Sequence, residues 1–164
     1  MAKSLLPPGA TYEQAAEVLR NGRYRRYQHV RTVGNNTTLS REGHSGTIVL
    51  RLHGNAIYRW HSCGVVEFSL AGWNTHITRE RLRHLLPHGY MVGTKSFVPY
   101  CFVYWWERVP WDYSVRKEDA IPLESDGWYR VLHLSDGKET LARIAEAYGG
   151  SCWWTWDLDS HDWC

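Results

Sequence analysis

The sequence lacks the features typical of membrane, secreted and zinc-stabilised proteins. None of its apolar runs, in 164 residues, approaches the roughly 18 needed to cross a bilayer. Residues 1–9 include a lysine but no apolar core of signal-peptide length. The four cysteines form no Cys-x-x-Cys pair, so we expect reduced thiols rather than a structural zinc site. These absences predict a cytoplasmic protein.

Catalytic motifs are also missing. There is no G-x-S-x-G elbow, phosphate-binding loop or dinucleotide fingerprint, and neither Cys63 nor Cys101 has the local signature of a nucleophile. His84 and His88 have metal-ligand spacing, but a proline between them disturbs the helical register, and exposed polar histidines are the alternative. The acidic tail 157–164 lacks the glycine and the terminal glutamate of a calcium-binding loop. We therefore expect no catalytic residues, metal or cofactor, which favours a non-enzymatic protein.

Charge is distributed unevenly along the chain. Residues 1–84 hold twelve Lys and Arg against five Asp and Glu, whereas residues 85–164 hold seven against twelve. Such asymmetry indicates charged partners, or two halves that attract each other within the fold. We expect one domain over 1–164, with a basic sub-unit 1–89 and an acidic, tryptophan-rich sub-unit 90–164.

Aromatic residues are abundant, with ten Trp and ten Tyr. Large aromatics stabilise both cores and interfaces, so they either build a large core or lie partly at the surface. Eight of the ten Trp fall between Trp105 and Trp163, in the acidic half. We expect a partner-binding surface there, formed by Trp105, Trp106, Trp111, Trp153 and Trp154.

Periodicity predicts an α+β fold that begins with a short helix and an antiparallel β-meander. Thr11 is a good N-cap for a helix over 12–19. Four short runs of β-branched and aromatic residues follow, separated by glycine-containing segments as in consecutive hairpins. These runs are 37–40, 47–52, 56–60 and 65–70.

The rest of the chain predicts two more helices and three more strands. A basic helix at 79–86, capped by Thr75 or Thr78, places Leu82, Leu85 and Leu86 on one face. A polar loop spans 110–126 and a helix opened by Asp136-Gly137 spans 137–148. Strands are predicted at 97–109, 127–134 and 152–156.

A segment rich in arginine and tyrosine spans residues 20–31. Arginine side chains bind phosphate and tyrosine rings stack on exposed bases, a combination typical of RNA and single-stranded nucleic-acid sites. The alternative is a basic strand that docks on the acidic half or on an acidic protein. The predicted nucleic-acid-binding residues, which include two from the basic helix, are Arg23, Tyr24, Arg25, Arg26, Tyr27, Arg31, Arg79 and Arg83.

Residues 35–87 contain two linked motifs. The first is Leu-His-Gly-Asn-Ala-Ile-Tyr-Arg-Trp at 52–60, and the second is Gly-Trp-Asn-Thr-His-Ile-Thr-Arg-Glu-Arg-Leu at 72–82. This stretch resembles a group of small uncharacterised proteins encoded by bacteriophages. Ala71 stands where that group has a glycine, and His84 where asparagine is common. The resemblance implies a phage origin and implies no activity; Trp73 is expected to fix the turn against Leu82 and Leu85.

These observations together predict a phage accessory protein in the bacterial cytoplasm. It would bind a nucleic acid or a host nucleoprotein complex through its basic residues. The first alternative is an inhibitor of a host defence system, such as an anti-CRISPR protein, because exposed aromatics and a strong charge field favour fast, tight protein binding. The second is a minor structural component of the virion.

Overall fold

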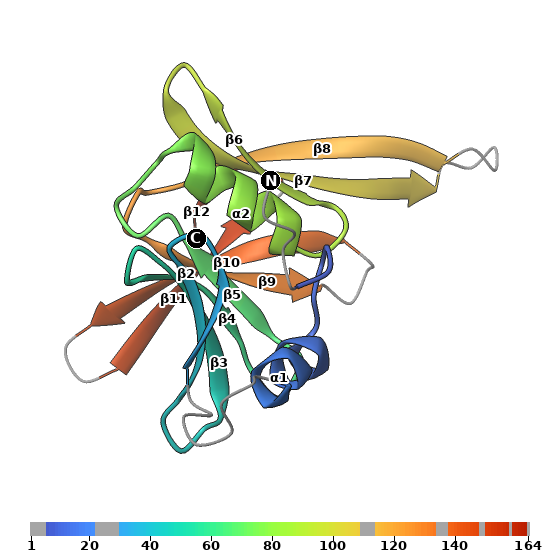
Figure 1. Cartoon of the computed structure of the whole chain (residues 1–164). Coiled ribbons are helices and arrows are strands. Elements are labelled where there is room, and N and C mark those ends of the chain that lie inside the picture. The colour runs from blue at the N-terminus through green and yellow to red at the C-terminus, as the bar shows by residue number, and fades with distance from the viewer. Residues whose placement is uncertain are drawn as a thin grey trace.

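The computed structural model describes residues 6–21, 30–108, 114–133, 138–147, 150–157 and 159–163 (Figure 1). Within these residues the helices are α1 (Tyr12–Arg20) and α2 (His76–Leu85). The strands are β1 (Val30–Gly34), β2 (Thr37–Glu42), β3 (Thr47–Leu52), β4 (Asn55–Trp60), β5 (Val66–Ser69), β6 (Tyr90–Lys95), β7 (Val98–Arg108), β8 (Ser114–Pro122), β9 (Trp128–His133), β10 (Glu139–Ala147), β11 (Gly150–Asp157) and β12 (Asp162–Trp163).

The strands form two antiparallel sheets. The larger sheet has the order β1-β2-β3-β4-β5-β9-β10-β11-β12, and the smaller has the order β6-β7-β8. Consecutive strands are neighbours except at β5 and β9, which pair across the sequence occupied by α2 and the smaller sheet. The predicted α+β class and the β-meander are confirmed.

Helix α1 forms where the sequence predicts it. The Thr11 hydroxyl accepts a hydrogen bond from the Gln14 backbone N–H, and the Gln14 side chain accepts one from the Thr11 N–H. This capping box satisfies two N–H groups that a helix terminus leaves without partners. Neither helix within the described residues is long and apolar enough to cross a membrane.

Helix α2 begins three residues before the predicted start at residue 79. Thr75 is the N-cap, and its hydroxyl accepts a hydrogen bond from the Thr78 N–H at 3.2 Å. Thr78, Leu82 and Leu85 are buried at the i, i+4, i+7 spacing of one helix face. The buried face of α2 is therefore one turn longer than the leucines alone indicate.

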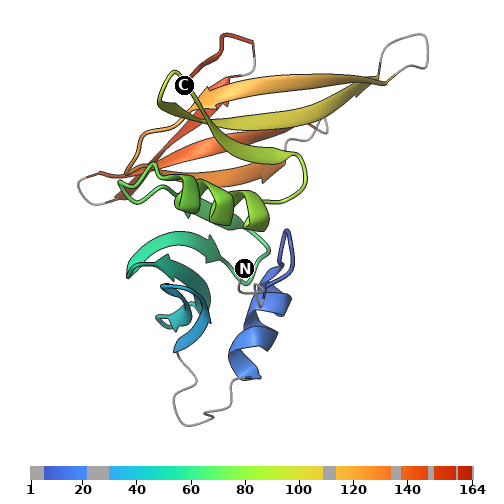
Figure 2. The ribbon, with the colours of Figure 1, turned by 45° about the horizontal axis from the view of Figure 1, so that its top comes forward.

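Helix α2 lies in the middle of the molecule and contacts β4 and β6 (Figure 2). The buried Tyr58 hydroxyl donates to the Leu85 carbonyl at 3.1 Å, and the Trp60 Nε1–H donates to the Ala10 carbonyl at 2.6 Å. One cluster of buried apolar side chains includes residues from both halves of the chain, such as Leu50 and Leu141. The single-domain organisation stays a prediction, which this shared cluster favours.

Two predictions about the second half are wrong. The predicted helix at 137–148 is strand β10, paired with β9 on one side and β11 on the other. Its alanine-rich sequence suits a helix, but tertiary pairing overrides local propensity, and Asp-Gly is also a frequent hairpin dipeptide. The predicted loop at 110–126 contains β8, whose residues 114–122 pair with β7. The strand was not predicted because its sequence contains several charged residues. Such residues are common in β8 because it lies at a sheet edge, where polar side chains are tolerated.

Glu67 forms a buried ion cluster at the β5–β9 junction. Arg130 of β9 donates two hydrogen bonds to its Oε1 atom, at 2.6 and 3.0 Å, and His61 Nε2 lies 3.1 Å from its Oε2 atom. Arg59 completes the cluster at 3.8 Å. Burial by itself raises the pKa of Glu67, but the hydrogen bonds from His61 and Arg130 outweigh it and hold the pKa below its ordinary value.

We predict that Glu67→Gln lowers the free energy of unfolding by about 2–3 kcal/mol at neutral pH, because three basic groups lose their carboxylate. Because the pKa of Glu67 is lower in the folded state, its carboxylate stabilises the fold at pH values above 4.5, the pKa in the unfolded chain. This stabilisation disappears as the pH falls through the folded-state pKa. Urea unfolding at several pH values should show the difference from wild type shrinking below pH 4.5. Glu42→Gln, at a half-exposed ion pair with Arg51, is the control and should cost under about 1 kcal/mol. Equal losses in both variants would contradict the account.

Candidate functional site

The predicted nucleic-acid-binding residues are only partly described. Arg23, Tyr24, Arg25, Arg26 and Tyr27 lie outside the described residues. The remaining three are arginines that each donate to a backbone carbonyl: Arg31 to Val18, Arg79 to Asn74 and Arg83 to Val92. They therefore help to join different elements, and their role in binding nucleic acid stays a prediction.

The structure describes only some of the predicted partner-binding tryptophans. Trp154 on β11 is 37% exposed, with the Arg143 guanidinium 5.5 Å from its ring centre. The backbone of β7 places Trp105 and Trp106 opposite Lys117 and Arg116 of β8, and Trp153 lies on β11 opposite Ile144. Trp111 lies outside the described residues, as do the side chains of Trp105, Trp106 and Trp153.

The most exposed aromatic side chain in the described part of the chain is at an unexpected position. Phe97 is 98% exposed, at the apex of the β6–β7 hairpin. Ser96 and Phe97 form its two-residue turn with φ values of 49° and 68°, a conformation usually occupied by Asn-Gly. A bulky side chain is rare in this left-handed region because of steric conflict with its own backbone. The fold thus holds a phenyl ring in solvent on strained backbone, which often marks a functional position.

An apolar pocket of about 410 Å³ is lined in part by Trp73 and Thr75, the two sequence neighbours of Asn74. Trp73, Ile77 and the β3–β4 turn line it, together with Ile57 and Leu70 from the sheet. Trp73 is 61% exposed and Ile77 is 52% exposed, so the pocket opens to solvent between two apolar side chains. Its volume is at the lower end of the range for ligand pockets and suits one or two apolar side chains.

Hydrogen bonds join the pocket to the hairpin apex. The Asn74 side-chain amide donates to the Phe97 carbonyl at 3.3 Å, and Arg79 donates to the backbone carbonyl and the side-chain oxygen of Asn74. We call the pocket and the exposed side chains of Trp73, Ile77, Phe97 and Val98 the apolar site. These four are among the seven large apolar side chains that are exposed in the described residues, so exposed apolar area is concentrated here.

The structure corrects the expected role of Trp73. Its side chain forms an open pocket wall, whereas Leu82 and Leu85 lie in the core. Most of the pocket lining belongs to the two sequence motifs, although these motifs predicted no pocket. Ala71 has a φ of 51°, a left-handed conformation that favours glycine. Phe97 was expected in a strand, because Ser-Phe carries none of the usual turn signals.

A second pocket, of about 430 Å³, is polar. The Arg59 guanidinium lies 3.8 Å from the ring centre of Trp128, and Arg143 forms an ion pair with Glu124 at 2.5 Å. These charges already have partners within the pocket, so it is the weaker binding candidate. In the part of the chain that is described, no group of three or more His, Cys, Asp or Glu could hold a metal ion.

Comparison with known proteins identifies the chain as a phage protein. Residues 14–118, well over half of the 164, match the family model described as Kyanoviridae Gp96 protein. The chain belongs to this family. The match includes the whole apolar site and confirms the phage origin implied by residues 35–87. No curated protein and no solved structure matches the chain.

We predict that Phe97→Gly raises the free energy of unfolding by about 0.5–1 kcal/mol. Glycine relieves the left-handed strain, which outweighs its greater freedom in the unfolded chain, and the fully exposed ring contributes no buried contact. Ala71→Gly should have a similar effect for the same backbone reason. Chemical unfolding measures both, and a clear loss of stability in Phe97→Gly would show that the ring is needed for folding.

Proposed function

We propose that this protein is a non-enzymatic phage accessory factor that acts by binding a host nucleoprotein complex, with the apolar site contacting a protein component. The observation that carries the proposal is Phe97, an aromatic ring placed fully in solvent on strained backbone. A folded chain gains nothing from such a ring until a partner covers it. Buried aromatic anchors dominate binding energy in protein interfaces.

The pocket beside Phe97 supports a protein partner. An interface anchor from the partner would enter the pocket between Trp73 and Ile77, while Phe97 would enter a depression on the partner. The hydrogen bonds through Asn74 and Arg79 hold the two parts in a fixed relation. A preorganised surface of this kind loses less conformational entropy on binding than a flexible one.

The charged groups near the apolar site are mixed. Exposed Lys95 precedes the hairpin apex in sequence and exposed His76 precedes Ile77, and the exposed Glu80 carboxylate lies 3.9 Å from His76 Nε2. A polar rim around an apolar centre is typical of protein interfaces. An inhibitor of a host defence system would use the same surface. The inhibitor hypothesis is therefore a special case of the proposal, in which the bound host complex loses its activity.

The proposal predicts that tagged wild-type protein retains a specific host protein from a cell lysate and that Phe97→Gly reduces retention at least about tenfold, as expected for a hot-spot residue. Trp73→Ala should weaken retention by a comparable amount. Quantitative mass spectrometry of the retained proteins measures this.

The control is Val30→Ala, which removes an exposed apolar side chain, 60% exposed, from strand β1. It should retain the same protein at wild-type level. Retention that is unchanged in Phe97→Gly and Trp73→Ala, in folded protein, would rule out the apolar site as the contact.

A further inference from the structure

The outer face of the smaller sheet carries a row of aromatic rings. Residues of β7 alternate: Cys101 and Val103 are fully buried on the inner face, while the rings of Tyr100, Phe102 and Tyr104 are half-buried on the outer face. Exposed Met91 lies on this outer face because it pairs with Phe102. Exposed Val98, which pairs with Lys95, lies there because it is two residues before Tyr100 on the same strand. We call these three rings and two aliphatic side chains the aromatic face.

Small neighbours leave the rings accessible. Tyr100 lies between Gly93 of β6 and Pro122 of β8, and Phe102 lies between Met91 and Ala120. The Phe102 ring leans across Gly93, since its Cε2 atom is 2.9 Å from the position that a β-carbon at residue 93 would occupy. The ring edge therefore covers Gly93, and the Phe102 side chain as a whole is half-buried. The Tyr100 and Phe102 ring centres are 6.3 Å apart and the planes are inclined by 32°.

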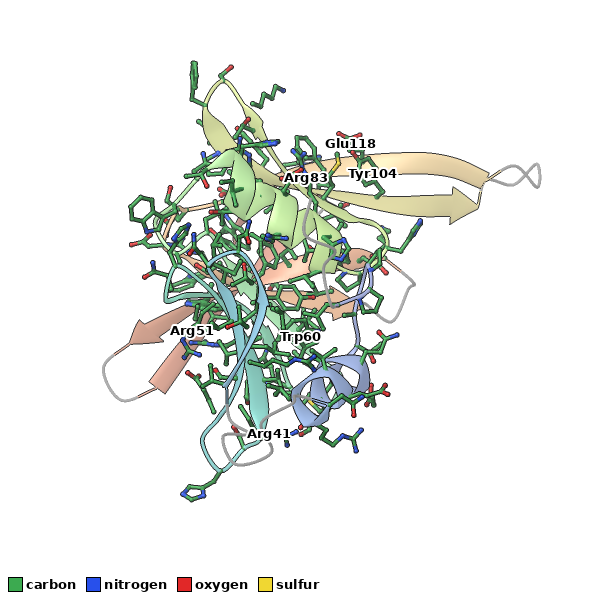
Figure 3. All side chains as sticks on the ribbon, viewed as in Figure 1. Arg41, Arg51, Trp60, Arg83, Tyr104 and Glu118 are labelled. Carbon is green, nitrogen blue, oxygen red and sulfur yellow. The ribbon has the colours of Figure 1, made fainter. Side chains whose placement is uncertain are left out.

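Positive charge borders the aromatic face at the β6 edge. Arg83 is exposed and held by a hydrogen bond from its Nε to the Val92 carbonyl at 2.6 Å, with its Nη2 atom 3.8 Å from the β-carbon position at Gly93. Lys95 is exposed at the end of the same strand. Glu118, opposite Tyr104, is an exposed carboxylate on this face (Figure 3). Two cations at one edge and a row of flat rings suit an anionic, aromatic ligand better than an apolar one.

We propose that the aromatic face binds single-stranded nucleic acid. Bases of an extended strand stack on Phe102 and Tyr100, and Arg83 and Lys95 contact the phosphates beside them. Stacking of unpaired bases on aromatic side chains of an antiparallel sheet, with cations along the backbone, is the general mode of single-strand recognition. Paired bases cannot reach the rings, so duplexes bind more weakly. The aromatic face shares Val98 with the apolar site, but the rings on which bases would stack belong to the aromatic face alone, so this proposal does not depend on the protein contact.

The test is a fluorescence-anisotropy titration of the purified full-length protein with labelled oligothymidylate, oligouridylate and a duplex, at two salt concentrations. The wild type should bind both single strands more tightly than the duplex, with affinity falling as salt rises. The double variant Tyr100→Leu and Phe102→Leu should bind single strands at least about tenfold more weakly, because stacking of each base is lost.

Three further variants separate the explanations. Gly93→Ala should weaken binding several-fold, because the new β-carbon displaces the Phe102 ring while both rings remain in the sequence. Tyr12→Leu is the matched control, because it removes a half-buried tyrosine from α1, and it should bind like wild type. The triple variant Arg23→Ala, Arg25→Ala and Arg26→Ala tests the arginine-rich segment. Thermal unfolding checks that each variant is folded.

Absence of single-strand binding by the wild type at low salt would overturn the proposal. So would binding that the double variant and Gly93→Ala leave unchanged, and so would loss confined to the triple arginine variant, which would assign the site to residues 20–31. If the double variant instead loses a host protein and the wild type binds no oligonucleotide, the aromatic face is a protein interface and the proposal fails. The retention of a partner through Phe97 is unaffected by any of these results.

Discussion

The ion cluster around Glu67 is the interaction on which the arrangement of both surfaces depends. It lies where β5 pairs with β9, the point at which the nine-stranded sheet joins strands that are not consecutive in sequence. Because β9 returns beside β5, α2 and the smaller sheet are held against the larger sheet. The Gly72 N–H then donates to the Ser125 carbonyl at 2.6 Å, and this contact joins the turn after β5 to the connection between β8 and β9. Glu67 is an acidic residue of the basic half and Arg130 is a basic residue of the acidic half. Each residue of this pair therefore has the charge opposite to the net charge of its own half.

Both candidate surfaces include residues of one hairpin. The β6–β7 hairpin presents Phe97 at its apex and the aromatic rings of β7 along its outer face, while its inner face supplies Val92, Cys101 and Val103 to the core. Strand periodicity makes this division unavoidable: a strand with small buried residues at alternate positions must place its aromatics on the other face. Under the two proposals, the same element contacts a protein at its apex and a nucleic acid along its side.

Local signals were sufficient to predict much of the fold. The Thr11 cap, the glycine-containing turns of the meander and the leucines of α2 gave helices and strands close to those observed. Prediction failed at β8 and β10, where pairing with neighbouring strands outweighs local composition. The site was harder to predict because Phe97 lies in a turn that its side chain disfavours, and no propensity scale anticipates a strained residue. The tryptophan count pointed to exposed aromatics, and Trp73 and Trp154 are exposed in the described residues, but the most exposed ring there belongs to Phe97.

The most direct test of the account is photo-crosslinking of the full-length protein to a uridine oligonucleotide, with the modified residues located by mass spectrometry. Crosslinking depends on contact between a base and a side chain, so it reports position rather than affinity. The account predicts adducts on Tyr100, Phe102 or Tyr104. Adducts confined to residues 20–31, or an absence of adducts under conditions where the oligonucleotide is bound, would contradict it.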